Sequence, residues 1–174
     1  MTAVDHQAGA LIVLRGNSGS GKSTVASLVQ ADIGPGECLV VPQDVVRRQL
    51  LNEADRAEVA SKDLLGTIAA WGLGRGLVVV VEGILNAGRH QRTLEHLAGI
   101  ATRSHFFAWD LPLDETLRRH ATRAKAEAFT VDEMSGWYHG WQPLDFVTET
   151  RFDASVSART AADLVLAAVG RANP

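Results

Sequence analysis

Residues 16–23 have the types and spacing that a phosphate-binding loop requires. They read G-N-S-G-S-G-K-S and follow an apolar run directly. In this pattern, the P-loop, glycines let successive main-chain N–H groups turn toward phosphate oxygens. Lys22 brings a positive charge to the β- and γ-phosphates, and the Ser23 hydroxyl can bind Mg²⁺. We therefore predict that the chain binds a nucleoside triphosphate through Gly16, Asn17, Ser18, Gly19, Ser20, Gly21, Lys22, Ser23 and Thr24.

A carboxylate and two cations follow the second apolar run. Asp44 comes directly after Val41-Pro42-Gln43, and Arg47 and Arg48 come one helical turn later. A carboxylate that faces a P-loop can accept the proton of an attacking hydroxyl group. We predict that Asp44 is this general base and that Arg47 or Arg48 holds the acceptor. The alternative is that Asp44 only caps the helix that begins at residue 45.

The third apolar run ends in an acidic residue. Four valines at positions 78–81 precede Glu82, in the place where P-loop proteins hold Mg²⁺ or its water shell. Glu82 is therefore a candidate metal ligand and substrate contact. The alternative, a solvated glutamate at a strand end, is disfavoured by the four preceding valines. Asn86, on the following loop, either touches the substrate or caps the next helix.

Four cations lie within residues 118–125. Arg119 and Arg123 share one helix face, where like charges destabilise the helix and so favour a role toward an anion. Phosphoryl transfer uses cations around the transferred group, often delivered by a mobile lid. We predict a lid over about residues 118–141, with Arg123 as a catalytic residue and Arg119 as a nucleotide contact. The alternative is a solvated charged face.

Three further residues are candidate contacts, each with a structural alternative. Trp137 and Tyr138 either line an acceptor pocket or form the core face of a helix. Arg159 follows the last apolar run and either lies beside the nucleotide base or decorates the surface.

Composition restricts the class of protein. A length of 174 residues suits one domain over residues 1–174, with residues 1–9 expected to form a disordered tail. The net charge of −3 gives no general attraction to nucleic acid, so a nucleic-acid partner is not expected. No apolar run reaches membrane-spanning length or resembles a secretory signal, so we expect a cytoplasmic protein.

Apolar runs alternate with helical patterns along the chain. Strands are predicted at 11–14, 38–41, 77–81, 105–109 and 152–156. Helices are predicted at 22–31, 45–73 with an interruption near Asn52, 87–98, 113–123, 131–139 and 161–169. This alternation predicts parallel βαβ units with right-handed crossovers in a single three-layer α/β domain. Ligands bind such sheets beyond the carboxyl ends of the strands.

Four segments together resemble small P-loop kinases of the nucleoside-kinase-like superfamily, which includes chloramphenicol phosphotransferase, zeta toxins and AAA-type predicted kinases of bacteria. The segments are LRGNSGSGKST (14–24), QDVVRRQLL (43–51), VVVVEGIL (78–85) and LDETLRRHATRAKAEAFTVDEMSGWY (113–138). The resemblance implies a P-loop NTPase fold, with a five-stranded parallel sheet in the order 2-3-1-4-5 and an arginine-bearing helical lid. Lys22 and Ser23 match the P-loop pair, Asp44 the base and Arg123 the lid arginine, whereas Glu82 stands where many relatives have aspartate.

The resemblance also implies Mg-ATP as the phosphate donor and a hydroxyl group as the acceptor. The expected partners are a nucleotide and a small molecule, such as a nucleoside or another antibiotic that a resistance kinase inactivates. The alternatives are a polynucleotide 5′-hydroxyl kinase and a non-kinase P-loop switch protein. No N-K-x-D segment for reading guanine occurs in the chain, which disfavours a GTPase switch. We expect a monomer or a homodimer.

Overall fold

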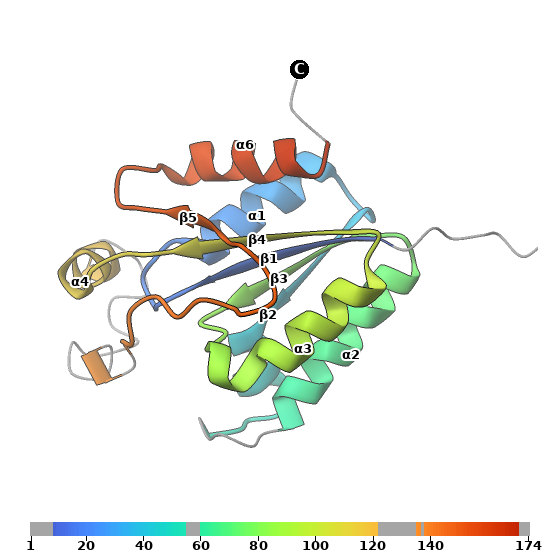
Figure 1. Ribbon diagram of the computed structural model, residues 1–174, viewed down its shortest axis with the longest axis horizontal. Coiled ribbons are helices and arrows are strands. Elements are labelled where there is room, and N and C mark those ends of the chain that lie inside the picture. The colour runs from blue at the N-terminus through green and yellow to red at the C-terminus, as the bar shows by residue number, and fades with distance from the viewer. Residues whose placement is uncertain (1–8, 55–59, 122–134, 137, 171–174) are drawn as a thin grey trace, which may run out of the picture.

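The computed structural model describes residues 9–54, 60–121, 135, 136 and 138–170, drawn as coloured ribbon in Figure 1. Its strands are β1 (Ala10–Gly16), β2 (Cys38–Pro42), β3 (Val78–Gly83), β4 (Arg103–Trp109) and β5 (Thr150–Phe152). Its helices are α1 (Lys22–Ile33), the π-helix η1 (Val45–Leu50), α2 (Ala60–Gly74), α3 (Ala87–Ile100), α4 (Leu113–Ala121) and α6 (Ala158–Ala168). Within these described residues, no helix is long and apolar enough to span a membrane.

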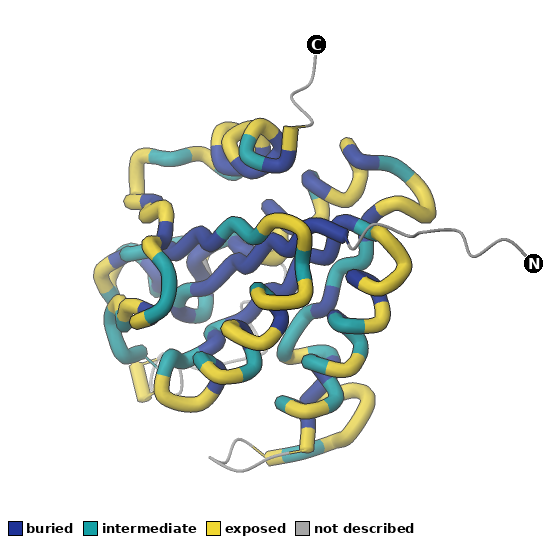
Figure 2. Tube along the Cα trace, turned by 45° about the vertical axis from the view of Figure 1, so that its right-hand side comes forward, coloured by how far each residue is buried: buried dark blue, intermediate teal, exposed yellow. Residues whose placement is uncertain are grey.

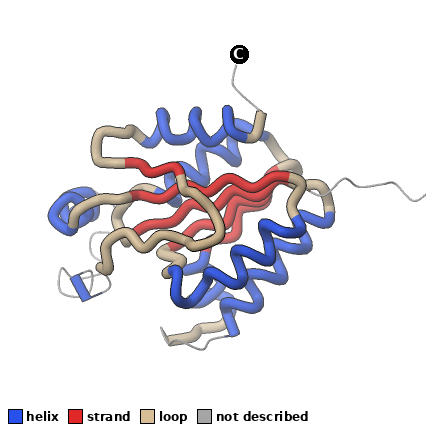
Figure 3. The backbone as a smooth tube through the Cα atoms, in the orientation of Figure 1, coloured by secondary structure: helices blue, strands red, loops and turns tan. Residues whose placement is uncertain are grey.

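The five strands form one parallel sheet in the order β2-β3-β1-β4-β5, which confirms the predicted fold. Helices α1 and α6 cover one face, and α2 and α3 cover the other (Figures 1 and 3). Because side chains alternate along a strand, Ile12 and Leu14 of β1 enter one core, whereas Leu11 and Val13 enter the other. Figure 2 shows the buried central strands enclosed between helices with exposed outer faces.

The register of the sheet positions the loops that follow the strands. Glu82 of β3 lies beside Leu14 of β1 on one side and beside Pro42 of β2 on the other. The P-loop after β1, the turn after β2 and the loop after β3 therefore leave the same edge of the sheet. This edge is where ligands bind in parallel α/β folds.

The last strand lies earlier than the sequence pattern predicts, at residues 150–152 rather than 152–156. Its end is set by Asp153, whose side chain accepts hydrogen bonds from the backbone N–H and the hydroxyl of Ser155 at 2.8 and 2.6 Å. Ser157 then caps α6 by accepting a hydrogen bond from the backbone N–H of Thr160. Such side-chain bonds compete with strand pairing and turn the chain after Phe152.

A buried ion pair joins the end of β1 to the segment before β5. The Nη1 of Arg15 lies 3.0 and 2.9 Å from the two carboxylate oxygens of Glu149, and only 5% and 1% of the two side chains are exposed. Glu149 also accepts hydrogen bonds from Trp141 Nε1 and from the backbone N–H of Leu144. Burial lowers the pKa of Arg15, and the Glu149 carboxylate opposes that shift.

Replacing Glu149 with glutamine should therefore destabilise the fold strongly. The variant keeps the size of the side chain but leaves the Arg15 charge buried without a counter-charge, which costs about 3–5 kcal/mol. Urea unfolding measures this cost. The control is Arg118→Gln, since Arg118 forms its ion pair with 69% of its side chain exposed and should cost less than about 1 kcal/mol. If both variants lost a similar amount of unfolding free energy, Glu149 would not be the essential counter-charge of the buried Arg15.

Candidate functional site

The P-loop curls around its own lysine. Gly19 and Gly21 adopt φ angles of 84° and 104°, which side-chain-bearing residues rarely tolerate. The buried ammonium of Lys22 donates hydrogen bonds to the carbonyl oxygen of Asn17 at 2.8 Å and to the Ser20 hydroxyl at 3.1 Å. Lys22 is also the first residue of α1, so the N-terminus of this helix points at the loop. The loop thus combines N–H groups, a helix N-terminus and a positive charge.

The hydroxyl and the carboxylate predicted to bind a metal ion lie next to each other. The Ser23 hydroxyl donates a hydrogen bond to Glu82 Oε1 at 3.0 Å, and Glu82 is buried. Two hard oxygen donors at this spacing suit Mg²⁺, which is usually held by one or two carboxylates together with phosphates and water. The residues present therefore fit the ion that the sequence implies.

Asp44 lies two residues beyond β2, at the same edge of the sheet, and 67% of its side chain is exposed. Its carboxylate accepts a hydrogen bond from Arg47 Nη2 at 3.2 Å and lies 3.6 Å from Arg48 Nε. Both arginines thus hold Asp44 in the structure. The capping alternative finds no support here, because the Asp44 side chain makes no capping hydrogen bond to η1.

Arg119 reaches the P-loop from α4. Its Nη1 donates to the carbonyl oxygen of Ser20 at 3.2 Å and its Nη2 to that of Ala154 at 2.9 Å. Glu115 orients this side chain through a hydrogen bond from Arg119 Nε. Hydrogen bonds from Arg118 and Arg119 lower the pKa of Glu115 to about 2, so this carboxylate is charged at neutral pH. The structure therefore brings Arg119 to the nucleotide loop.

The other predicted residues are dispersed. Arg123 and Trp137 lie outside the described residues, as does most of the expected lid. The Tyr138 hydroxyl donates to the carbonyl oxygen of Leu111 at 3.0 Å, and Asn86 precedes α3 without a side-chain cap. Arg159 forms ion pairs with Asp163 and with Asp32 at the far end of α1. These contacts do not bring Arg159 to the P-loop, and its place beside the base stays a prediction.

Sequence reasoning missed a pair of residues, Gln43 and His90, that fix the loop after β3. Gln43 Oε1 accepts a hydrogen bond from the backbone N–H of Leu85 at 3.1 Å, and a Cβ added to Gly83 would lie 2.4 Å from the same oxygen. Leu85 is buried with a φ angle of 44°, a conformation that costs energy and is held by its surroundings. Gln43 therefore links the turn that carries Asp44 to the loop that follows Glu82.

His90 supports Gln43 from α3. Its Nε2 lies 3.5 Å from Gln43 Nε2, and its Nδ1 lies 3.3 Å from the carbonyl oxygen of Asn86. A neutral ring that donates from Nδ1 and accepts at Nε2 satisfies both contacts. Burial lowers the pKa of His90 to about 4, so the ring is neutral at physiological pH.

Acidification should therefore destabilise the folded protein through His90. In the unfolded chain this histidine has its ordinary pKa near 6.5 and takes up its proton first, so stability falls as the pH drops from about 6.5 to about 4. Between pH 7 and pH 4, the unfolding free energy should fall by about 3 kcal/mol more than in a His90→Gln variant. Urea unfolding across this range measures the difference. The matched control is His96→Gln on the exposed face of α3, in which the unfolding free energy should depend on pH as in the wild type. If it depended on pH equally in all three proteins, His90 would not be the source of the acid sensitivity.

The parallel sheet in this strand order, together with the phosphate-binding loop after β1, defines a P-loop NTPase. The model of a family described as an AAA domain matches residues 11–136, and the chain belongs to this family. No curated protein matches the sequence.

Solved structures of kinases share the fold. APS kinase of Mycobacterium tuberculosis, solved in complex with AMPPNP and APS, is 25% identical with a TM-score of 0.69, over 94% of this chain and 98% of that one. A candidate kinase of Chloroflexus aurantiacus has 16% identity and a TM-score of 0.72, over 96% and 99% of the two chains. The tunicamycin resistance protein of Deinococcus radiodurans has 18% identity and a TM-score of 0.66, over 95% and 100%. The chain thus has a kinase-like P-loop fold and resembles small P-loop kinases.

Proposed function

We propose that the protein is an ATP-dependent kinase that transfers the γ-phosphate of Mg-ATP to a hydroxyl group of a small molecule. The observation that carries this proposal is the convergence of three groups at one edge of the sheet. The Lys22 ammonium lies inside the P-loop, and Glu82 accepts a hydrogen bond from Ser23 of the same segment. Asp44 follows β2, which pairs with β3 on the side away from β1.

Each group has a role in phosphoryl transfer. The P-loop N–H groups and Lys22 bind the phosphates, and Lys22 exchanges its hydrogen bonds to Asn17 and Ser20 for phosphate oxygens. Ser23 and Glu82 hold Mg²⁺, which when bound neutralises charge on the phosphates. Asp44 takes the proton of the acceptor hydroxyl. Arg119 reinforces the loop from α4, and Arg123 is the proposed lid residue that contacts the transferred group.

The acceptor is proposed by class only, as a small hydroxylated molecule. The likeness to APS kinase and to a tunicamycin resistance protein supports a small acceptor rather than a polynucleotide. Inactivation of a nucleoside antibiotic or of another antibiotic is the proposed physiological role within this class. The chain is proposed to act in the cytoplasm as a monomer or a homodimer.

One experiment tests the proposal. Purified protein is incubated with Mg-ATP and a panel of sugars, nucleosides, antibiotics and oligonucleotides, and mass spectrometry detects added phosphate. We expect a phosphorylated small molecule. A product found only on the 5′ ends of oligonucleotides would instead establish a polynucleotide kinase. Absence of any product, together with preferential binding of GTP, would overturn the kinase assignment.

Replacing Glu82 with glutamine should raise the Mg²⁺ requirement. The amide keeps one oxygen but loses the charge that holds the ion. The Mg²⁺ concentration that gives half-maximal activity should therefore rise at least about tenfold, as expected for the loss of one charged contact. A Mg²⁺ titration at fixed ATP measures the shift. The control is Glu95→Gln on the exposed face of α3, which should leave the titration unchanged. An unchanged titration in Glu82→Gln would remove Glu82 from the metal site.

A further inference from the structure

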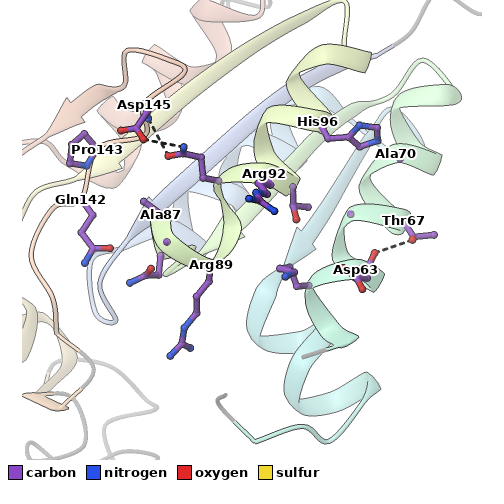
Figure 4. A pocket seen from close by; sticks show the side chains of 16 residues that line it. Asp63, Thr67, Ala70, Ala87, Arg89, Arg92, His96, Gln142, Pro143 and Asp145 are labelled. Carbon is purple, nitrogen blue, oxygen red and sulfur yellow. Dashed lines mark hydrogen bonds between the residues drawn. The ribbon is translucent and has the colours of Figure 1, made fainter. Parts of the chain in front are cut away.

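A groove of about 1240 Å³ lies between α2 and α3. One wall carries Lys62, Asp63 and Thr67 of α2, and the other carries Arg89, Arg92 and His96 of α3 (Figure 4). Small residues, among them Ala70 and Ala87, leave the space open between the walls. Near the start of α3, Gln91 and Asp145 close the groove through two mutual hydrogen bonds of 3.2 Å.

The groove includes residues at the starts of α2 and α3, near the edge of the sheet that carries the P-loop. Both α2 and α3 begin at this edge, because each runs back toward the start of a following parallel strand. Two of the lining residues, Asn86 and Ala87, lie where the chain passes from the loop after Glu82 and Gly83 of β3 into α3. Arg92 lies about 9 Å further along α3 than Asn86, given a rise of about 1.5 Å per residue. A molecule whose hydroxyl group lies near this loop must therefore extend about 9 Å along the groove to reach Arg92.

Positive charge gathers in this groove although the chain as a whole has a net charge of −3. Three cations, Lys62, Arg89 and Arg92, line it together with two carboxylates, of which Asp145 is bound by Gln91. Within the described part of the chain, Lys62 and Arg92 form neither a hydrogen bond nor an ion pair. The cations come from both walls, so their charges act on the same space.

This arrangement does not stabilise the fold. Arg89 and Arg92 are spaced three residues apart, so they lie on one face of α3, where like charges weaken a helix. No carboxylate of the described residues is paired with Lys62 or Arg92 to offset this repulsion. A bound anion offsets it, since charge-assisted hydrogen bonds from arginine and lysine are among the strong polar contacts.

We infer that the groove between α2 and α3 is an anion-binding extension of the acceptor site, and that the natural acceptor is an alcohol that also carries a phosphate, sulfate or carboxylate group. This inference rests on the proposed kinase function. The inference restricts the proposed acceptors from hydroxylated molecules in general to those that also carry an anionic group. Lys62 and Arg92 bind the anionic group, while the hydroxyl group lies near Asp44.

Two measurements test this inference separately. The first uses no acceptor: the P-loop is filled with Mg-AMPPNP, and sodium sulfate is titrated while the backbone amides of α2 and α3 are followed by NMR, with chloride at equal ionic strength as the reference. Saturable shifts near Lys62 and Arg92 that vanish in a Lys62→Ala/Arg92→Ala variant are expected. Shifts that are absent, or equal with chloride, would overturn the inference.

The second measurement compares matched acceptors, such as a sugar with its phosphate and a nucleoside with its monophosphate. The anionic member should have a kcat/KM at least about tenfold higher, and the double variant should lose this preference mainly through KM. The charge-matched control is Arg75→Ala/Arg103→Ala, whose arginines lie at the opposite edge of the sheet; it should keep the preference. Equal use of both members by the wild type would overturn the inference. If no member is phosphorylated, the kinase proposal fails, and the sulfate titration still decides whether the groove binds anions.

Discussion

Replacing Lys22 with alanine is expected to lower kcat/KM for phosphoryl transfer by on the order of a thousandfold, comparable with the removal of a preorganised charge-stabilising group. The ammonium is held by the Asn17 carbonyl and the Ser20 hydroxyl within a loop that is itself largely buried. It is therefore in place before the phosphates bind. Arg119 also donates to the loop, but it does so from α4 and bonds the carbonyl oxygen of Ser20 rather than its hydroxyl group.

The measurement is steady-state turnover of the acceptor found in the panel, with circular dichroism to confirm that the variant folds. Ser27→Ala is the matched control, because Ser27 lies on the exposed side of the same helix and bonds only the carbonyl oxygen of Ser23 among the described contacts. It should retain turnover. Lys22→Ala activity within tenfold of the wild type would contradict the role of the P-loop in transfer.

Asp44→Asn is expected to lower the rate of the chemical step by about 10²–10⁴-fold while ATP still binds, as for loss of a general base. Asparagine keeps the shape of the side chain and one oxygen for Arg47, but it cannot accept the hydroxyl proton. The fold and the position of η1 should therefore be preserved, and the loss should appear in the single-turnover rate.

Rapid-quench kinetics and ATP titration separate these two effects. Asp114→Asn serves as the control, since Asp114 is an exposed carboxylate in the first turn of α4. A wild-type single-turnover rate in Asp44→Asn would reduce Asp44 to an ion-pair partner of Arg47 and Arg48. A loss of ATP binding instead would mean that the turn after β2 supports the P-loop rather than the acceptor.

The parts of the site that depend on local sequence were predictable. The P-loop is one continuous segment, and the rule that ligands bind at strand ends selected Asp44 and Glu82. The structure places both at one edge of the sheet, and their roles in proton transfer and metal binding stay predictions. The predicted strand at 11–14 is shorter than β1, which runs from Ala10 to Gly16, because Arg15 interrupts the apolar pattern. That arginine is neutralised by Glu149, 134 residues away, and a contact at such separation leaves no periodic signal.

The remaining features depend on how separate elements meet. Gln43 reaches the backbone of Leu85 only because β2 and β3 pair in a particular register, which no motif encodes. The groove between α2 and α3 depends on helix packing in the same way. The ion pairs of Arg159 with Asp32 and Asp163 likewise join separate elements, and its predicted contact with the nucleotide base stays a prediction.

The two flanks of residues 122–134 both attach to the nucleotide loop. On one side Arg119 donates to the Ser20 carbonyl oxygen, and on the other the backbone N–H of His139 donates to Asn17 Oδ1 at 3.2 Å. Asn17 and Ser20 are also the residues that the Lys22 ammonium bonds, and the proposed mechanism has Lys22 exchange these bonds for phosphate oxygens. If phosphate binding changes these contacts, occupancy of the loop and the geometry of both flanks are linked. By thermodynamic reciprocity, a ligand that shifts either flank then alters the affinity for the nucleotide by the same factor by which the nucleotide alters the affinity for that ligand.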